Sequence, residues 1–430
     1  MLKPPASRLL PVNEPYAPFA ARLQQELGYA APWVDGRPAV RSSPIVVSAS
    51  LWAELRRAAE AMAGAFDEVV RRLVAEPELF EVWMQPTPHQ RLMWLASGGL
   101  WHGFARIDLF LCMDGRVQMA ELNADTPTGQ VEAVELGAMV AAAHAGLIDP
   151  NAGYRARFLA MVRRLHDAQM GVGAPIDRVA ILYPTDIPED LAVVRMLQRW
   201  LEEVGSAVVI GSPYNLELDG EGHLCVFGQP VDVVLRHYKT DWWTERPPLF
   251  IDEPPLADAA ALEGPLWAIL SAERARRVTV VNPFGAMAAQ NKRAMALLWE
   301  LRETFSAEAQ AAVEAWLPET RRVDDAMRHE LLSEPSAWVL KSDYGCEGEE
   351  VLVGRATTPE VWRAAVDRLV PSAWIAQRYF EVAPLDGESL PNYGVYLVAG
   401  EAAGLYVRLD PMGSLTDTLS CAAPALVEPC

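Results

Sequence analysis

Several signatures that define common protein classes are missing from this chain of 430 residues. Its five cysteines are scattered, odd in number and never spaced as CxxC, which argues against a disulfide framework and a cysteine zinc site. The seven histidines show no HxxxH or HxH spacing, and neither GxSxG nor HExxH occurs. No GxGxxG follows the first strand predicted in the α/β region, so dinucleotide binding is not indicated.

Long apolar runs and positive charge are also scarce. Candidate membrane segments such as LGAMVAAAHAGL are too short and too rich in alanine to span a bilayer, so we expect no membrane partner. A net charge of −20 without a basic stripe argues against a nucleic-acid partner. The acidity is compatible with a polycationic small substrate, and equally with a simple role in solubility. The N-terminal segment lacks the apolar core of a secretory signal, so we expect a cytoplasmic protein.

Length and pattern predict three regions, since 430 residues exceed one simple core. Residues 1–100 are expected to be mostly helical. Residues 101–290 are expected to form a ribbon that binds metal and ligand, followed by three strands, VAILYP, AVVIGSP and VDVVLRHYK. A helix is expected between the first two, and strand–helix–strand of this kind is typical of a parallel α/β unit. Residues 291–430 return to helices, then to strands around a glycine-rich turn that we expect to act as a lid.

A two-stranded ribbon is predicted over residues 104–132. In its first run apolar residues alternate with polar ones, as in a strand that buries one face. The dipeptide Asp114-Gly115 is a strong hairpin signal. If these two residues form the whole loop, Met113 pairs with Arg116 and the rest of the ladder follows.

This register places two carboxylates face to face. Asp108 lies opposite Glu121, and Arg106 lies opposite Asn123, with opposed Cβ atoms roughly 5 Å apart. Because two carboxylates repel each other, a further group must hold them together. A hard divalent cation such as Mg²⁺ does so with oxygen ligands from carboxylates and amides. The alternative is that Arg106 alone neutralises the pair in an ordinary surface salt network.

Two lysines are candidates for phosphate binding. Lys341 ends an apolar strand, and Gly345 and Gly348 in the next turn would let backbone N–H groups approach phosphates. This spacing is not that of a P-loop, and an ordinary hairpin loop remains the alternative. Lys292 stands at the start of a predicted helix, where it opposes the helix dipole. A nearby phosphate would explain it, and so would plain exposure to solvent.

Two strand ends are candidates for ligand contacts. Residues 376–380, AQRYF, follow an apolar pair, and a strand edge here could offer its backbone to an adenine ring; an interior strand is the alternative. Residues 239–245, KTDWWTE, form a polar and aromatic cluster after another strand. Ligands favour the carboxyl ends of parallel strands, although a tryptophan-rich packing loop would look the same.

Taken in order, these segments resemble the glutathionylspermidine synthetase family over roughly residues 95–425. The matching motifs are R-x-D…E-x-N-x-D-T-P-T-G…E in the ribbon, Lys239-Thr240, Asn291-Lys292, Lys341 with its glycines, and Arg408 in the last strand pair. The resemblance implies an α/β (α+β) protein with a circularly permuted ATP-grasp fold. It also implies a parallel α/β subdomain on the substrate side and a helical N-terminal region.

The resemblance implies an ATP- and Mg²⁺-dependent ligase that joins a small-molecule or peptide carboxylate to an amine, such as a polyamine, through an acylphosphate. Two magnesium ions would be held by Asp108, Glu121 and Asn123. Arg106 would contact the transferring phosphoryl group, and Arg408 would stabilise phosphate charge from the opposite side.

The remaining roles implied by the resemblance concern ATP and the substrates. ATP would be bound by seven residues: Lys292, Lys341, Gly345, Gly348, Gln377, Arg378 and Tyr379. The carboxylate substrate would lie near Thr126, Thr128, Lys239 and Thr240. The pair Glu189 and Asp190 would correspond to an acidic pair near the substrate.

Two features depart from the family pattern. Family synthetases can carry a basic residue in the glycine-rich loop, but this chain has Cys346 and Glu347 there, which weakens one phosphate contact. The amidase domain of the bifunctional members has no counterpart here, so hydrolysis of the product is not expected. The alternative to a ligase is a non-catalytic nucleotide-binding or scaffold protein on a degenerate ATP-grasp fold.

Overall fold

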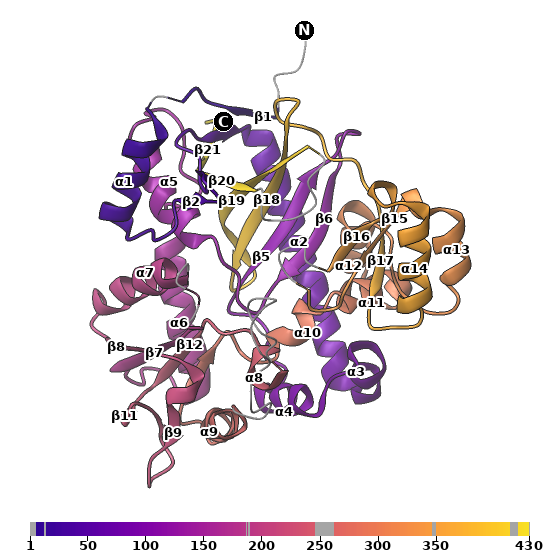
Figure 1. The fold of residues 1–430 in the computed structure, drawn as a ribbon. Helices are drawn as coiled ribbons and strands as arrows, with labels where there is room; N and C mark the ends of the chain where they lie inside the picture. Colours follow the sequence, from indigo (N-terminus) through magenta and orange to yellow (C-terminus); the bar gives the residue numbers. More distant parts are fainter. Residues whose placement is uncertain are drawn as a thin grey trace.

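The computed structural model describes residues 6–12, 14–185, 187, 190–245, 262–345, 350–412 and 420–429 (Figure 1). Its helices and several sheets confirm the predicted mixture of α and β structure. Four residues discussed above, Glu189, Cys346, Glu347 and Gly348, lie outside the described residues.

A five-stranded antiparallel sheet occupies the centre of the molecule in Figure 1. Its order is β20-β19-β18-β5-β6, so the ribbon lies directly beside strands from the end of the chain. Their bounds are β5 Phe104–Leu111, β6 Val117–Asn123, β18 Ser389–Val398, β19 Glu401–Pro411 and β20 Cys421–Ala423. The segment after β6 continues as a π-helical turn, Val131–Glu135, and α5, Leu136–Ala141.

One face of this sheet is apolar and packs on α2, Ala49–Ala75. Ser48 caps this helix, because its Oγ accepts a hydrogen bond from the Leu51 N–H at 3.2 Å. Apolar residues recur along α2 every three or four positions and are buried against the sheet. Helices α3 Pro77–Met84, α4 Pro88–Ser97, α10 Ala286–Gln290, α11 Arg293–Glu300 and α12 Ala307–Trp316 add to the same core.

The predicted parallel α/β unit is confirmed. Its strands are β7 Arg178–Leu182, β8 Ala207–Gly211, β12 Val233–Arg236 and β13 Thr279–Val281, in the order β13-β12-β7-β8. The sequence predicted the first three and missed β13. Helices α6 Tyr154–Met170 and α7 Leu191–Glu202 pack against it, while α9 Glu263–Arg274 packs against the small sheet described next. Helix α8, Trp242–Glu245, follows β12. A small sheet of β9 Leu216–Leu218, β10 Leu224–Val226 and β11 Gln229–Pro230 extends from its edge.

A second antiparallel sheet, drawn in orange in Figure 1, lies on the side of the central sheet away from the parallel α/β unit. Its order is β14-β17-β15-β16, with bounds Thr320–Arg322, Ile375–Arg378, Trp338–Lys341 and Val351–Val353. Helices α13 Arg328–Ser333 and α14 Pro359–Leu369 cover it through a core that contains Trp338 and Trp362. Strand β17 therefore lies between two other strands. Of the two alternatives for residues 376–380, the structure has the interior strand and not an open strand edge.

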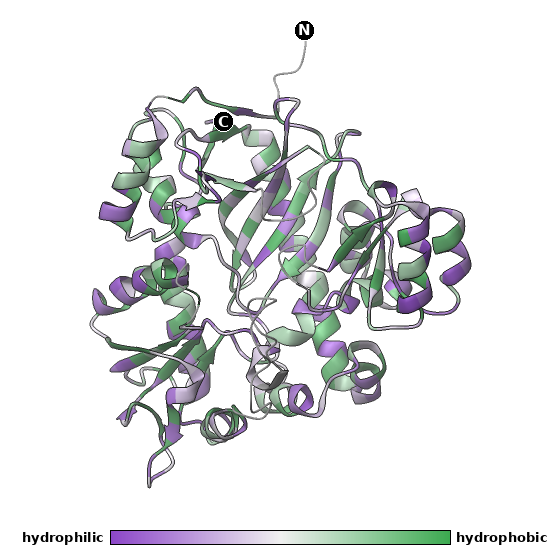
Figure 2. Cartoon of the chain, viewed as in Figure 1, coloured by the Kyte–Doolittle hydropathy of each residue, from purple (hydrophilic) through white to green (hydrophobic). Residues whose placement is uncertain are grey.

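The two ends of the chain meet in a small sheet, β1-β4-β21, with bounds Ser7–Leu9, Ile45–Val47 and Ala425–Val427. Helix α1, Tyr16–Leu27, and the hairpin of β2 Trp33–Val34 and β3 Arg37–Pro38 lie between β1 and β4 in the sequence. Figure 2 shows hydrophobic residues gathered on the strands and on α2, with hydrophilic residues on outer helices such as α7 and α14. No helix among the described residues is long and apolar enough to cross a membrane.

Candidate functional site

The ribbon has the predicted pairing of its polar residues. Asp108 lies opposite Glu121, and Arg106 lies opposite Asn123. The turn, however, has three residues rather than two. The Cys112 N–H donates to the Arg116 carbonyl at 2.8 Å, and the Gly115 N–H donates to the Cys112 carbonyl at 2.9 Å. The predicted two-residue loop is therefore wrong.

A second irregularity restores the predicted register. The ladder shifts between Asp108 and Leu109, because Ala120 is an extra residue on β6. The three-residue turn, whose last residue Gly115 has a φ of +83°, shifts the ladder by one residue. The bulge at Ala120 shifts it back, so Glu121 still faces Asp108.

Polar residues of four strands share one face of the central sheet. Asp108 on β5 lies opposite Gly394 on β18, and Asn392 on β18 lies opposite Arg408 on β19. Directly opposed residues project from the same face, so several polar residues share this face, among them Arg106, Asp108, Glu121, Asn123, Asn392 and Arg408. We call it the polar face. It is the reverse of the apolar face that packs on α2.

Arg106 and Asp108 form a buried two-pronged ion pair on the polar face. Arg106 Nε donates to Asp108 Oδ1 at 2.7 Å and Nη2 donates to Oδ2 at 3.0 Å. The third arm of the guanidinium, Nη1, donates to the Thr128 carbonyl at 3.0 Å, and the group lies 5.2 Å from the centre of the Tyr406 ring. A Cβ at Gly394 would lie 2.7 Å from Arg106 Cδ, so glycine makes room for this side chain.

The two predicted phosphate lysines lie at Glu121 and at the residue before it. Lys292 Nζ lies 3.5 Å from Glu121 Oε2. Lys341 Nζ donates to the carbonyl of the bulge residue Ala120 at 3.0 Å and to Gln377 Oε1 at 2.8 Å. Burial alone would raise the pKa of Glu121, but Lys292, Lys341 and Arg106 together lower it to about 2. Burial and the charge of Lys292 lower the pKa of Lys341 to about 8, against the opposing charge of Glu121.

The proposal that Lys292 is simply exposed is wrong, since the residue is only 3% exposed. Its backbone N–H donates to the Asp343 carbonyl at 2.9 Å, and its Nζ donates to the Gly345 carbonyl at 2.5 Å. Lys292 thus joins the turn after β15 to the polar face. The sequence contains only four lysines among its 37 basic residues, and Lys239, Lys292 and Lys341 are three of them. That scarcity is a signal for these positions that pattern reasoning did not use.

The polar face also brings two amides to Asp108. Asn123 Nδ2 lies 3.4 Å from Asp108 Oδ2 and 3.3 Å from Glu121 Oε1, and Asn392 Nδ2 lies 3.4 Å from the same Asp108 oxygen. Asn392 is 5% exposed, and its Oδ1 has no hydrogen-bond partner within the described part of the chain. Sequence reasoning missed Asn392, because its place opposite Arg408 depends on a register shift between Tyr396 and Leu397.

The donor set on the polar face fits Mg²⁺ better than a softer metal. No group of three or more His, Cys, Asp and Glu side chains among the described residues is placed to hold a metal ion. A cation here would therefore be held by the two carboxylates and by amide oxygens, as hard cations prefer. The buried, unpartnered Oδ1 of Asn392 is one such oxygen.

The predicted adenine residues lie on β17 or just after it. Gln377 is buried and links Lys341 to Thr320, since its Nε2 donates to Thr320 Oγ1 at 3.2 Å. Arg378 lies 4.1 Å from the centre of the Trp338 ring and forms ion pairs with three carboxylates, those of Glu319, Glu330 and Glu334. The Tyr379 ring lies 4.6 Å from the Arg355 guanidinium. Arg378 thus has structural partners, whereas Gln377 connects to the polar face.

The predicted substrate residues lie near the end of β6 and after β12. Thr128 is exposed, and its carbonyl accepts hydrogen bonds from Arg106 and from the Tyr396 hydroxyl, the latter at 2.8 Å. Thr240 is buried and hydrogen bonded to Asp125 in the ribbon motif. Lys239 Nζ lies 3.4 Å from Asp241 Oδ2 and 5.1 Å from the Trp242 ring centre.

Three further residues complete this side of the site. Thr126 is half-buried. Asp190 lies 3.2 Å from His237 Nε2, so the described member of the predicted acidic pair lies beside the strand end that carries Lys239. Glu132, the last residue of the matched ribbon motif, accepts a hydrogen bond from the Tyr29 hydroxyl at 2.8 Å, and burial raises its pKa.

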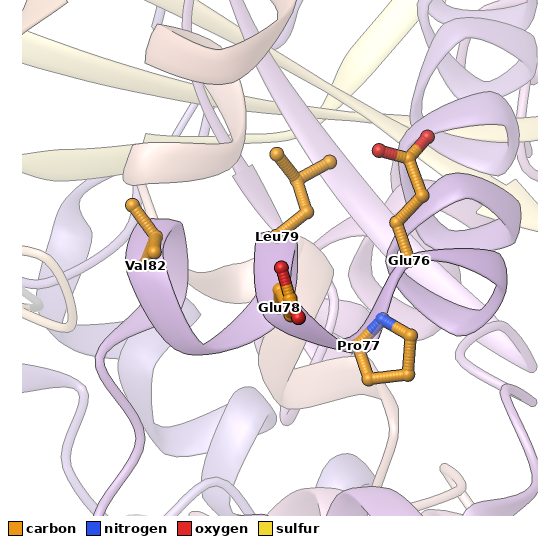
Figure 3. A pocket seen from close by; sticks show the side chains of 5 residues that line it. All are labelled: Glu76, Pro77, Glu78, Leu79 and Val82. Carbon is orange, nitrogen blue, oxygen red and sulfur yellow. The ribbon is translucent and has the colours of Figure 1, made fainter.

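A surface hollow lies elsewhere, at the beginning of α3 (Figure 3). It is lined by Glu76, Pro77, Glu78, Leu79 and Val82. None of the predicted site residues lines it, so we do not assign it to the site.

Comparison with known proteins agrees with the resemblance seen in the sequence. A crystal structure of a protein provisionally assigned as a gamma-glutamylcysteine synthetase, from Methylobacillus flagellatus KT, is 14% identical with a TM-score of 0.44, over 81% of this chain and 82% of that one. No curated protein matches the chain. The sequence profile of the family described as "Glutathionylspermidine synthase preATP-grasp" matches residues 15–428. Because that match spans nearly the whole sequence, the chain belongs to the glutathionylspermidine synthase family.

Proposed function

We propose that this protein is an ATP- and Mg²⁺-dependent ligase that joins a carboxylate to an amine through an acylphosphate. One observation carries the proposal: two lysines from different elements meet the polar face side by side, Lys292 at the Glu121 carboxylate and Lys341 at the carbonyl of the preceding residue, close to the Arg106–Asp108 pair. Phosphoryl transfer needs such a cluster, because the protein must position phosphates and balance their spread charge. Membership of a synthase family supports the same class of reaction.

We further propose that the central sheet and the sheet of β14–β17 hold the nucleotide between them, as in a circularly permuted ATP-grasp fold. Lys341 at the end of β15 contacts both sheets, which supports this arrangement. Lys292 and Lys341 would bind phosphates, and Gln377, Arg378 and Tyr379 would lie along the adenine. For this, Lys292 must exchange its contact with the Gly345 carbonyl for a phosphate oxygen.

The cation would be held by Asp108, Glu121 and Asn123, with Asn392 Oδ1 as a further oxygen donor on the polar face. When bound, Mg²⁺ offsets phosphate charge and orients the transferring group. Glu121 is ionised over the physiological pH range, because its pKa lies far below 7. It is therefore able to act as a ligand without losing a proton first.

The carboxylate substrate would lie between Arg106 and the loop of Lys239 and Thr240, beside Thr126 and Thr128. Arg106 is fixed by Asp108 and by the Thr128 carbonyl, so its charge is already oriented. Arg408 on β19 would face the phosphate from the other side of Asn392. The amine, for which we propose a polyamine, would approach near Asp190.

The proposal is tested by ADP release with pooled peptide carboxylates and polyamines as co-substrates. We expect ADP release that requires Mg²⁺, an acid and an amine together, with the amide product identified by mass. Glu121→Gln is the matched control, since it removes one charge and almost no volume. Mg²⁺-dependent ATP binding without turnover across the whole panel would instead favour the non-catalytic alternative.

A further inference from the structure

Asp125 lies at the end of the ribbon motif and has no role in the site described so far. It is 4% exposed, and it pairs with Arg236, whose side chain is fully buried. The Arg236 Nη2 lies 2.5 Å from Asp125 Oδ1. Thr240 donates twice to the same carboxylate, from its backbone N–H to Oδ2 at 2.6 Å and from its Oγ1 to Oδ1 at 2.8 Å.

The backbone of Asp125 is held as firmly as its side chain. Asn282, which follows β13, donates from Nδ2 to the carbonyls of Ala124 and Asp125, both at 2.9 Å. Gln290 at the end of α10 accepts the N–H groups of the same two residues at 2.7 and 3.1 Å. Asp125 is thus a fixed point, and whatever it binds is fixed relative to the ribbon.

Asp125 binds both ends of the loop that follows β12. Arg236 is the last residue of β12, and Thr240 lies four residues further on. Arg236 also donates from Nη1 to the Tyr238 carbonyl inside this loop at 2.8 Å, and it lies 4.7 Å from the centre of the Phe284 ring. Lys239 is therefore enclosed in a loop whose ends meet on one carboxylate.

We propose that Asp125 and Arg236 are positioning residues that hold the loop of Lys239 and Thr240 against the ribbon, and so set the carboxylate site of the ligase. We call these two residues with Thr240 the Asp125 clamp. This inference rests on the proposed function. A buried ion pair is weak evidence for stability as such, but its fully hydrogen-bonded geometry fixes where its neighbours lie.

The first test compares two buried threonines. Thr240→Val removes the hydroxyl contact with Asp125, whereas Thr279→Val removes a similar contact, from Thr279 Oγ1 to His166 Nδ1 at 3.0 Å, far along the same sheet. We expect Thr240→Val to raise the KM of the carboxylate substrate about tenfold, as loss of one charge-assisted hydrogen bond predicts. The KM of ATP and kcat should change less than twofold, and Thr279→Val should change none of the three.

The second test separates positioning from direct contact. Asp125→Asn does not touch the substrate in our proposal, yet it should raise the same KM. Arg236→Gln should do likewise, and the double variant should be no worse than the worse single one, because both remove one interaction. If Thr240→Val raises the KM but Asp125→Asn does not, the Thr240 hydroxyl acts on the substrate itself and the clamp is wrong.

Amide hydrogen exchange tests the clamp without any turnover. The amides of residues 237–243 should exchange faster in Asp125→Asn and Arg236→Gln than in the wild type. Their exchange in Thr279→Val should be the same as in the wild type. If the wild type proves inactive with every acid and amine while this segment loosens, the proposed function fails and the clamp stands as a structural joint. If the wild type is active, two results would overturn the positioning role. One is unchanged exchange of this segment in Asp125→Asn and Arg236→Gln, and the other is faster exchange without a change in the KM of the carboxylate substrate.

Discussion

Two buried aspartate–arginine pairs lie at either end of the ribbon motif, and they differ in how completely they are satisfied. In the pair Arg236–Asp125, both carboxylate oxygens accept strong hydrogen bonds, and the backbone is held as well. In the pair Arg106–Asp108, the arginine is equally well placed, but the amides that approach Asp108 Oδ2 lie at 3.4 Å. Beside them the Oδ1 of Asn392 has no partner among the described residues.

This difference indicates what each pair is for. Removing charges from water costs several kcal/mol per ion, and only complete hydrogen bonding offsets the cost. A pair with every acceptor filled has nothing left to offer a ligand and serves as a joint. A pair with long contacts and an unfilled neighbour leaves acceptors for a ligand, which supports our proposal that a cation and phosphates bind at the polar face.

The largest effect on stability should come from breaking the pair Arg236–Asp125. Asp125→Ala leaves the fully buried Arg236 guanidinium without its carboxylate, so the free energy of unfolding should fall by about 3–5 kcal/mol. Denaturant unfolding followed by circular dichroism measures it. The control is Asp367→Ala, which breaks an exposed ion pair with Arg328 and should cost about 1 kcal/mol or less. Equal losses in the two variants would show that the Asp125 pair is not a joint.

Breaking the pair Arg106–Asp108 should lower the turnover rate more than the stability. Asp108→Asn keeps the shape of the side chain but removes the charge that a cation needs, so kcat should fall on the order of a hundredfold to a thousandfold. Unfolding should change less than in Asp125→Ala, because asparagine still offers Arg106 one acceptor oxygen, whereas alanine offers the fully buried Arg236 none. Steady-state ADP release and denaturant unfolding check the two halves. Full turnover with a large loss of stability would reverse the comparison.

The three described lysines allow a test with identical substitutions. Lys292→Met and Lys341→Met should each weaken ATP binding by roughly tenfold to a hundredfold, because each removes a charge-assisted contact worth about 1.5–3 kcal/mol. Lys239→Met should leave the Kd of ATP unchanged and raise the KM of the carboxylate substrate. Isothermal titration calorimetry separates the nucleotide effect from the substrate effect. Equal weakening of ATP by all three variants would mean that Lys239 does not belong to a separate carboxylate site.

The sequence predicted the ribbon's polar pairing correctly but for an incomplete reason. The hairpin signal at Asp114-Gly115 suggested a two-residue loop, and the structure has three. The extra residue Ala120 cancels the error. A bulge has no reliable local signal, because it depends on what the freed carbonyl finds, which here is Lys341 from a distant strand.

Long-range convergence was the part that sequence patterns could not supply. Strand β7 and its neighbours followed from apolar runs, which are local. Lys292 reaches Glu121, and Lys341 reaches the carbonyl of the neighbouring Ala120, only because the fold joins residues more than 150 positions apart. Asp125 stood inside the motif and was passed over, because its importance comes from Arg236 and Thr240, which only the fold brings to it.

The smallest effect concerns a third buried carboxyl, Glu273 on α9, which feels the charge of Arg236 but lies outside the Asp125 clamp. It is 7% exposed, and its Oε2 has no hydrogen-bond partner among the residues that the structure describes. Burial, opposed by Arg236, raises its pKa from 4.5 to about 8.

Between these two pH values the folded protein keeps the proton and the unfolded chain releases it. The free energy of unfolding should therefore fall as the pH rises from 4.5 to 8, and level off above 8. Glu273→Gln removes the ionisable group and should stabilise the protein by about 2 kcal/mol at pH 6, which lies 1.5 units above 4.5, while flattening this slope. Denaturant unfolding at a series of pH values measures both effects, with the exposed Glu263→Gln at the start of the same helix as the control. A slope that is the same in Glu273→Gln and in the wild type would show that a buried carboxyl near Arg236 needs no partner of its own, and that the contrast between filled and unfilled acceptors does not govern this region.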